Sequence, residues 1–217
     1  MKNVLHRIII AFTLLTISQL SFAASNNVHT IPQLAGGLDL YDNQICQQSL
    51  QQDCAQQQND FFAYSKCRLA AMEKYPSCTQ NLAINKQVMG FSLIKNKNYG
   101  KVDVVYADVV GADHSSQYFM ITNTGELIEP TVTVDTSEIT KQYPNALFLP
   151  IIVDGFPTTG CLPDGQTLLI FQQQVNEGCL ACKKLGVASV GYAFSKTGDY
   201  LGAELLTFTA YVTAQPD

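Results

Sequence analysis

The residues of this chain best suited to chemistry are its cysteines, two of which form the close pair Cys179-Leu-Ala-Cys182. In redox proteins such a pair opens a helix, whose N-terminal dipole helps to lower the pKa of the first thiol. Here Lys183 and Lys184 follow the pair and lead directly into a strand pattern. We therefore interpret the pair as a structural disulfide that closes a loop. The alternative is thiol–disulfide exchange that also involves Cys161, in which the two lysines would stabilise a thiolate.

Residues that could catalyse hydrolysis are few. Apart from one in the N-terminal leader described below, the histidines are His29 and His114. The stretch Asp113-His114-Ser115-Ser116 holds the residue types of a catalytic triad, but neighbours in sequence rarely face one another in that arrangement. Asp154 and Asp164 flank a loop without the closely spaced oxygen ligands that a cation site needs. The sequence has no motif of serine hydrolases, zinc proteases or nucleotide-binding proteins. We predict no catalytic residues, no metal and no cofactor.

The first 23 residues have the pattern of a secretory signal peptide. Lys2 and Arg7 form a basic start, residues 8–17 are an apolar run, and Ser21-Phe-Ala23 provides the small residues of a cleavage site. The run is shorter than the roughly 20 residues of a membrane span. We expect cleavage after Ala23, a periplasmic or secreted protein without a membrane span, and an extended lead-in over residues 24–40.

The mature chain would be acidic. Loss of Lys2 and Arg7 leaves 11 of the 13 basic residues against 18 acidic ones, which gives a net charge of −7. Arg68 is then the only arginine. Nucleic-acid binding depends on clustered lysine and arginine side chains that neutralise phosphates. We therefore expect no nucleic-acid partner.

Residues 41–80 predict two antiparallel helices. The first covers the glutamine-rich stretch Gln44–Gln58, with a cap at Asp42 or Asn43. The second runs from Phe61 to about Lys74 and ends before a proline, which cannot continue a helix. Because the connection between them is short, the two helices form a hairpin.

Four cysteines on this hairpin predict two nested disulfides. The turn brings Cys54 near Cys67, and the open end brings Cys46 opposite Cys78. Each such bond typically contributes about 2–4 kcal/mol. A zinc site is the alternative, but seven, twelve and ten intervening residues lack the close cysteine pairs that zinc usually requires. An oxidising compartment also favours disulfides.

Residues 87–212 predict a mainly antiparallel sheet. Lys101–Val110 has apolar residues on both parities, which indicates a central strand covered on both faces. Ala146–Val153 carries Pro150, which indicates an edge strand or a bulge. With the stapled hairpin on one face or end of the sheet, residues 41–217 are expected to form a single α+β domain.

Two loops are the predicted contact surface. One is Gly155–Gly165, rich in Gly, Pro and Thr, and the other is the loop closed by Cys179 and Cys182. A rigid scaffold with clamped loops lowers the ordering cost of binding. For Phe156 an inward orientation is favoured over contact with a partner. The candidate contact residues are Phe156, Thr158, Thr159, Leu180, Lys183 and Lys184.

The order of a strand, a short loop between two cysteines and a strand–turn–strand over Thr167–Phe208 resembles the C-terminal part of periplasmic lysozyme inhibitors. The resemblance implies an inhibitor-like role. In that family the loop between the cysteines is longer and carries a histidine, whereas Cys179-Leu-Ala-Cys182 has neither. The family also does not imply the N-terminal hairpin.

These patterns predict an exported, disulfide-stabilised, non-enzymatic protein that binds another protein or a component of the cell envelope. One alternative is a thiol–disulfide oxidoreductase or chaperone that uses Cys179 and Cys182. Another alternative is an accessory subunit of an envelope secretion machine.

Overall fold

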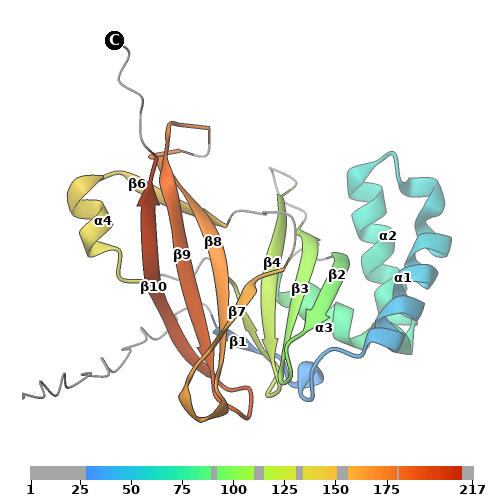
Figure 1. The fold of residues 1–217 in the computed structure, drawn as a ribbon. Coiled ribbons are helices and arrows are strands. Elements are labelled where there is room, and N and C mark those ends of the chain that lie inside the picture. Colours follow the sequence, from blue (N-terminus) through green and yellow to red (C-terminus); the bar gives the residue numbers. More distant parts are fainter. Residues whose placement is uncertain are drawn as a thin grey trace, which may run out of the picture.

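The computed structural model describes residues 28–88, 92–109, 115–130, 134–150, 156–179 and 181–211. The predicted leader and its cleavage site lie outside these residues. Two antiparallel five-stranded sheets lie next to one another, and helices cover their outer sides (Figure 1). The fold is α+β with antiparallel sheets, as the sequence predicted, but it has two sheets in place of the expected single sheet.

The N-terminal sheet has the strand order β1-β5-β4-β3-β2. Its strands are β1 (Val28–Thr30), β2 (Ser92–Asn98), β3 (Val102–Val109), β4 (Ser115–Thr122) and β5 (Glu126–Ile128). The prediction that residues 101–110 form a central strand is confirmed, because β3 pairs with both β2 and β4. Its apolar residues alternate between two covered faces: Val104 packs toward the other sheet and Val105 packs toward the helices.

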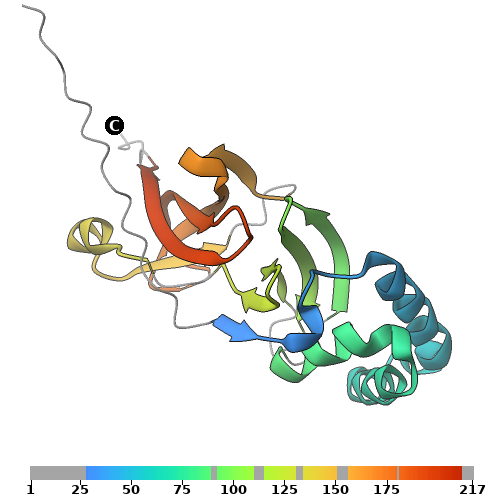
Figure 2. The ribbon, with the colours of Figure 1, turned by 90° about the horizontal axis from the view of Figure 1, so that it is seen from below.

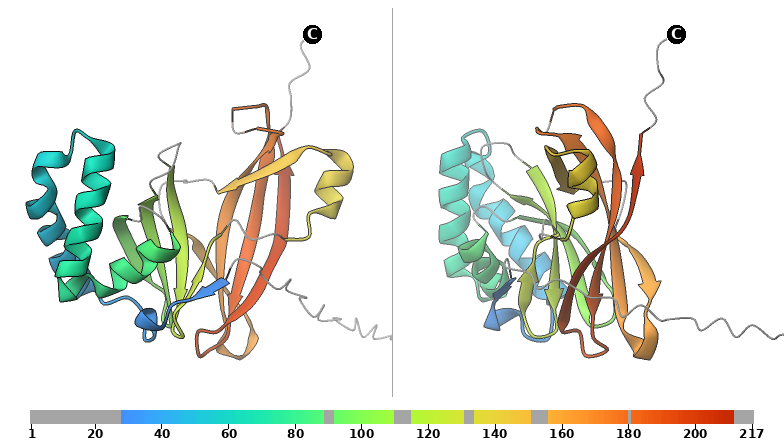
Figure 3. Two further views of the ribbon diagram at one scale, coloured as in Figure 1. Left: turned by 180° about the vertical axis from the view of Figure 1, so that it is seen from behind. Right: turned by 90° about the vertical axis from the view of Figure 1, so that its left-hand side faces the viewer.

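The C-terminal sheet has the order β10-β9-β8-β6, and β7 pairs with the first part of β8. Its strands are β6 (Ala146–Pro150), β7 (Thr158–Cys161), β8 (Thr167–Glu177), β9 (Lys184–Phe194) and β10 (Tyr200–Ala210). The short helix α4 (Ser137–Gln142) precedes β6 and lies beside this sheet (Figure 3). The edge position predicted from Pro150 is confirmed for β6.

The inner faces of the two sheets share one apolar core. Tyr118 of the N-terminal sheet meets Phe171 edge to face at 5.8 Å between ring centroids, and Phe171 meets Tyr192 at 5.4 Å. Burying a large apolar side chain contributes about 1.5–3 kcal/mol. At one end the sheets come together closely: a Cβ on Gly198, in the β9–β10 turn, would lie only 2.6 Å from the Cβ of Lys101.

A buried polar cluster crosses this core. Gln173 Nε2 donates to the carbonyl oxygen of Pro130 at 2.6 Å and to the hydroxyl of Tyr192 at 3.2 Å. The Tyr192 hydroxyl donates to the same carbonyl. Burial raises the pKa of Tyr192, so the phenol keeps the proton that it donates. Buried polar groups need such partners, and these bonds tie the segment after β5 to the C-terminal sheet.

The helical part consists of α1 (Leu40–Cys54), α2 (Phe61–Lys74) and α3 (Thr79–Gln87), with the short 3-10 helices η1 (Pro32–Leu34), η2 (Ala55–Gln57) and η3 (Pro76–Cys78). The predicted second helix is confirmed, and Asp60 caps it by accepting a hydrogen bond from the backbone N–H of Ala63. The first helix begins earlier than predicted, because Asp39 caps it in place of Asp42 or Asn43.

The helix that packs on the N-terminal sheet is α3, which the sequence did not predict. Ile84 of α3 and Leu34 of η1 are fully buried against Val105 and Phe119 on the outer face of that sheet. The hairpin of α1 and α2 has a separate core around Leu50. Seen from below, the hairpin lies beyond α3, on the side away from the C-terminal sheet (Figure 2). The hairpin therefore projects from the sandwich on α3.

The segment predicted as an extended lead-in over residues 24–40 contributes to the core from Val28 onward. β1 pairs with β5, and Leu34 is fully buried. The buried carboxylate of Asp103 accepts hydrogen bonds from the backbone N–H of Leu38 at 2.9 Å and from the side chain of Asn98 at 2.8 Å. This anchor fixes the entry to α1 on β3.

Candidate functional site

Two disulfides close the hairpin of α1 and α2, as the cysteine positions predicted. Cys54 and Cys67 are joined near the turn, with 5.8 Å between their Cα atoms, and Cys46 and Cys78 are joined at the open end, with 4.9 Å. Three of these cysteines, all but Cys67, are fully buried in the hairpin core. The alternative of a zinc site is wrong, because both disulfides use the sulfurs that would bind the metal.

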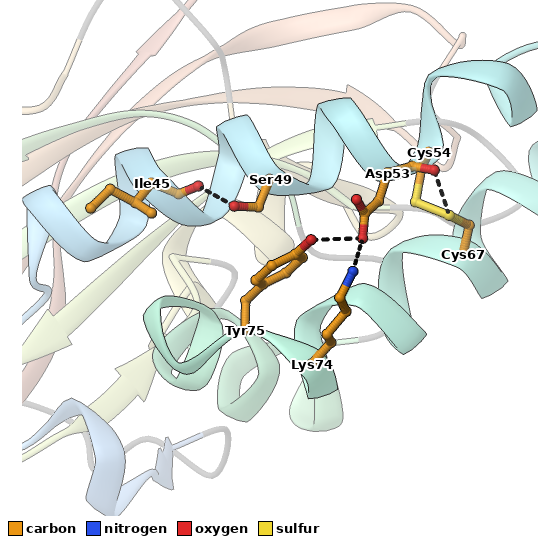
Figure 4. A network of polar contacts seen from close by, with 7 residues as sticks. All are labelled: Ile45, Ser49, Asp53, Cys54, Cys67, Lys74 and Tyr75. Carbon is orange, nitrogen blue, oxygen red and sulfur yellow. Dashed lines mark hydrogen bonds and ion pairs between the residues drawn. A yellow bond between two sulfur atoms is a disulfide. The ribbon is translucent and has the colours of Figure 1, made fainter.

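A polar contact adds to the covalent links between the two helices. Asp53 of α1 accepts hydrogen bonds from Lys74 Nζ at 3.0 Å and from the hydroxyl of Tyr75 at 2.9 Å (Figure 4). The bond from Lys74 and the bond from Tyr75 lower the pKa of Asp53 below its ordinary value. Exposure to water screens this contact. The contact of Asp53 with Lys74 and Tyr75 orients α2 against α1, and it adds little to the stability that the two disulfides give the hairpin.

The outer side of α2 exposes large apolar side chains. Phe62 is 82% exposed and Leu69 is 43% exposed. Residues seven apart lie on the same helix face, and the exposed Lys66 and Glu73 complete this stripe. The stripe carries one positive and one negative charge and is therefore neutral. We call Phe62, Lys66, Leu69 and Glu73 the α2 stripe.

The outer side of α1 has a different character. Tyr41 is 74% exposed at its start. Four exposed glutamines follow on the same face, at positions 44, 48, 51 and 52. This face is uncharged and carries amide groups, which water solvates well. It offers a matched comparison surface on the same rigid hairpin.

Two of the edge strands, β2 and β10, are poorly suited to pairing with another strand. β2 has a register shift between Leu93 and Lys95, and β10 has register shifts on either side of residues 202–205. β2 also carries the exposed Lys95 and Lys97. Bulges and edge lysines are devices that prevent edge-to-edge association. The β2 and β10 edges therefore disfavour strand addition.

The predicted contact residue Phe156 packs mainly into the protein. Its ring is partly buried against the inter-sheet core, 6.0 Å from the ring of Tyr118, and Lys95 Nζ lies 5.7 Å from the Phe156 ring centre. The Tyr99 hydroxyl donates to the carbonyl oxygen of Pro157 at 2.8 Å and holds this segment on the N-terminal sheet. The inward orientation favoured from the sequence is therefore correct.

The other predicted contact residues divide between β7 and the β8–β9 tip. Thr158 and Thr159 are exposed and belong to β7. The Gly155–Gly165 segment therefore contains a strand where a loop was predicted. Lys183 and Lys184 are exposed at the β8–β9 tip. Leu180 lies outside the described residues.

Cys179 and Cys182 are exposed and form a disulfide, with 5.0 Å between their Cα atoms. The backbone N–H of Cys182 donates to the carbonyl oxygen of Cys179 at 3.2 Å, and that of Glu177 donates to Lys183 at 2.9 Å. β9 begins at Lys184, so a strand follows the pair and the helix of thioredoxin-like sites does not. This is the loop closure that the sequence indicated.

Cys161 lies far from this pair. The three disulfides use six of the seven cysteines, and Cys161 is the remaining one. Its backbone pairs with Thr167 at the start of β8, whereas Cys179 follows the end of that strand. Eleven residues of β8 at about 3.3 Å each separate the two ends by roughly 30 Å. The structure thus does not bring Cys161 to Cys179 and Cys182, and the two predicted loops are not one surface (Figure 1).

A shallow groove of about 300 Å³ lies between η1 and α3. Ile31, Pro32, Leu82 and Ala83 give it an apolar lining, and Lys86 is the charged residue among those that line it. Among the described residues that line the groove, this ammonium group has no carboxylate or histidine with which to form an acid–base pair for catalysis.

Sequence reasoning missed the α2 stripe. Phe62 and Leu69 fall outside the face shared by Tyr64 and Cys67, and their seven-residue spacing was a signal that could have revealed a second apolar face.

Across the described ranges, His, Cys, Asp and Glu side chains nowhere gather in threes around a position that could hold a metal ion. Among the same residues, none of the helices has the length and apolar character needed to cross a membrane. The chain matched none of the protein-family models, curated proteins or solved structures with which it was compared.

Proposed function

We propose that this is an exported, non-enzymatic binding protein that docks the α2 stripe into an apolar groove of a partner protein. The observation that carries the proposal is the exposure of Phe62 and Leu69 on a helix that two disulfides hold rigid. Large exposed apolar side chains at helical spacing are the anchors of the helix-in-groove mode of recognition.

The hairpin is built in a way that favours this role. Both of its disulfides lie outside the core that joins the two sheets, so they stabilise the projecting hairpin itself. A helix whose backbone is already ordered loses little backbone freedom when it binds, and more of the contact energy then contributes to affinity.

The neutral charge of the α2 stripe favours an apolar groove on a protein over a charged ligand as its binding partner. Lys66 and Glu73 cancel within the stripe, so electrostatic attraction would contribute little to binding there. We therefore expect an affinity that changes little with salt concentration and depends on the two apolar anchors.

Export is supported by two independent features. Residues 1–23 have the composition of a signal peptide. Three disulfides in one chain are typical of proteins that fold in an oxidising compartment.

Site-specific photocrosslinking in the cells that make the protein tests the proposal. A photoreactive amino acid at position 66 lies between the two anchors, and one at position 48 lies on the glutamine face of α1. We expect a discrete crosslinked protein from position 66 that is absent from position 48 and is lost when Phe62→Asp is added. Equal crosslinking from both positions, or a crosslink that Phe62→Asp does not affect, would contradict docking through the α2 stripe.

A further inference from the structure

Cys179 and Cys182 differ from the buried cysteines of the hairpin in their accessibility to an external thiol. Cys179 and Cys182 are both exposed at the β8–β9 tip, whereas Cys46, Cys54 and Cys78 are fully buried. In thiol–disulfide exchange a thiolate must reach one sulfur of the bond, so burial prevents the reaction until the structure opens. We propose that the Cys179–Cys182 bond is a thiol-exchange site, which opens to an external thiol while the fully buried Cys46–Cys78 disulfide stays closed.

The reaction proceeds in two exchanges. The thiolate of a monothiol such as glutathione attacks one protein sulfur, forms a mixed disulfide and releases the other sulfur as a thiolate. A second glutathione thiolate attacks the bound glutathione sulfur and releases the remaining protein thiolate. Two electrons thus pass to the protein disulfide, two glutathione molecules become one oxidised glutathione, and the protein thiolates take up the protons that the attacking thiols lost. Lys183 and Lys184 place positive charge beside the departing thiolates and favour their release.

The surrounding structure allows this reaction without unfolding. The backbone N–H of Glu177 donates to Lys183 at 2.9 Å, and that of Gly178 donates to Asn145 at 2.7 Å. The β8–β9 ladder continues from the pairing of Val175 with Gly186. None of these bonds needs the disulfide, so reduction opens a ring of two intervening residues while both strands stay paired.

The attacking thiol has to come from another molecule. Cys161 is the remaining cysteine of the chain, and its backbone lies at the opposite end of β8. This inference does not depend on the proposed binding at the α2 stripe, because the β8–β9 tip and the hairpin belong to different parts of the fold (Figure 3).

Differential alkylation of the native protein with glutathione as the probe tests the proposal. The mature protein is exposed to reduced glutathione for increasing times, alkylated with N-ethylmaleimide, digested and measured by mass spectrometry. We expect Cys179 and Cys182 to be labelled at least about tenfold faster than Cys46 and Cys78, because attack on the buried pair requires prior opening. Equal rates for these two pairs, or earlier labelling of Cys46 and Cys78, would overturn the assignment.

Two further comparisons sharpen the result. Urea below the unfolding transition should accelerate reduction of the buried Cys46–Cys78 disulfide and change that of the Cys179–Cys182 bond by less than about twofold. Replacing both Lys183 and Lys184 by glutamine should slow the reduction of this bond. Lys196→Gln, which changes another exposed lysine in the β9–β10 turn, should leave it unchanged. Equal rates in the two lysine variants would contradict the electrostatic role assigned to Lys183 and Lys184.

Discussion

Removing the Cys46–Cys78 disulfide should loosen the hairpin without disturbing the two sheets. The bond joins residues 32 apart in sequence, and the chain-entropy relation gives about 3.7 kcal/mol for a ring of that size. Loss of that amount raises the opening equilibrium of the hairpin by about 500-fold, because each 1.36 kcal/mol is a factor of ten. Both sulfurs are fully buried, so the double alanine variant also loses packing, with an effect of the same sign.

Hydrogen–deuterium exchange with mass spectrometry measures this opening peptide by peptide. In the Cys46→Ala, Cys78→Ala variant we expect backbone amides of α1 and α2 to exchange faster by up to about 500-fold. Amides of β8 and β9 should keep their protection, because the hairpin core around Leu50 is separate from the inter-sheet core.

The matched control removes the disulfide at the β8–β9 tip. Cys179 and Cys182 are three residues apart, for which the same relation gives about 1.6 kcal/mol. Loss of the Cys179–Cys182 disulfide should speed hydrogen–deuterium exchange only at the β8–β9 tip. If removing the Cys46–Cys78 bond lowers protection in β9 as much as in α1, the hairpin and the sandwich unfold as one unit and our description of the hairpin is wrong. Unchanged protection in α1 would equally refute it.

Three further predictions concern acid stability, a turn and export. Hydrogen bonds lower the pKa of Asp53 below 3.8, so its carboxylate stabilises the fold above that pH and loses this contribution as the pH falls further. Asp53→Asn should therefore reduce the loss of Tm between about pH 4 and pH 2. An unchanged dependence of Tm on pH would contradict this. Gly198→Ala should lower Tm more than Gly100→Ala: both residues have positive φ, which costs about 1–2 kcal/mol with a side chain, but only at Gly198 would the new Cβ meet Lys101. Equal melting temperatures would contradict this close approach. Sequencing of the protein from the cells that make it should start at Ala24, and an intact N-terminus would contradict export.

The sequence predicted the hairpin well because cysteine geometry is restrictive. Two helices with a short connection allow Cys54 to reach Cys67 and Cys46 to reach Cys78, and the structure has these pairs. The parity of apolar residues likewise identified β3 as a strand covered on both faces.

Other elements gave weaker signals. α3 has few apolar residues, and one of its two buried residues is Asn81, whose amide donates to Asn43 on α1 at 2.8 Å. Packing against η1 and the N-terminal sheet, rather than a hydrophobic pattern in the sequence, therefore determines that these residues form a helix. β7 reads Thr-Thr-Gly-Cys, which resembles a loop, and becomes a strand through pairing with β8.

The candidate site depended on information that the sequence lacks. The two predicted loops lie at opposite ends of β8, because β7 pairs with the first part of this eleven-residue strand and the Cys179–Cys182 loop follows its last residue. Phe156 packs inward against Tyr118, which lies on β4 of the N-terminal sheet, far from Phe156 in sequence. For the α2 stripe the sequence held one signal, the seven-residue spacing of Phe62 and Leu69, and the exposure of these side chains in the structure identifies the stripe.

The most direct test of the central claim compares two charge-matched variants of the mature protein. Phe62→Asp with Leu69→Asp places two carboxylates in the α2 stripe, and Gln48→Asp with Gln52→Asp places two on the glutamine face of α1. Both change exposed positions of the same disulfide-closed hairpin, so equal melting temperatures establish that folding is intact. With the partner identified by crosslinking at position 66, titration calorimetry measures binding to each variant. We predict a loss of at least about 100-fold in affinity for the α2 variant, as expected when two anchor side chains are removed, and less than about threefold for the α1 variant. Equal affinities of the two variants would contradict docking through α2.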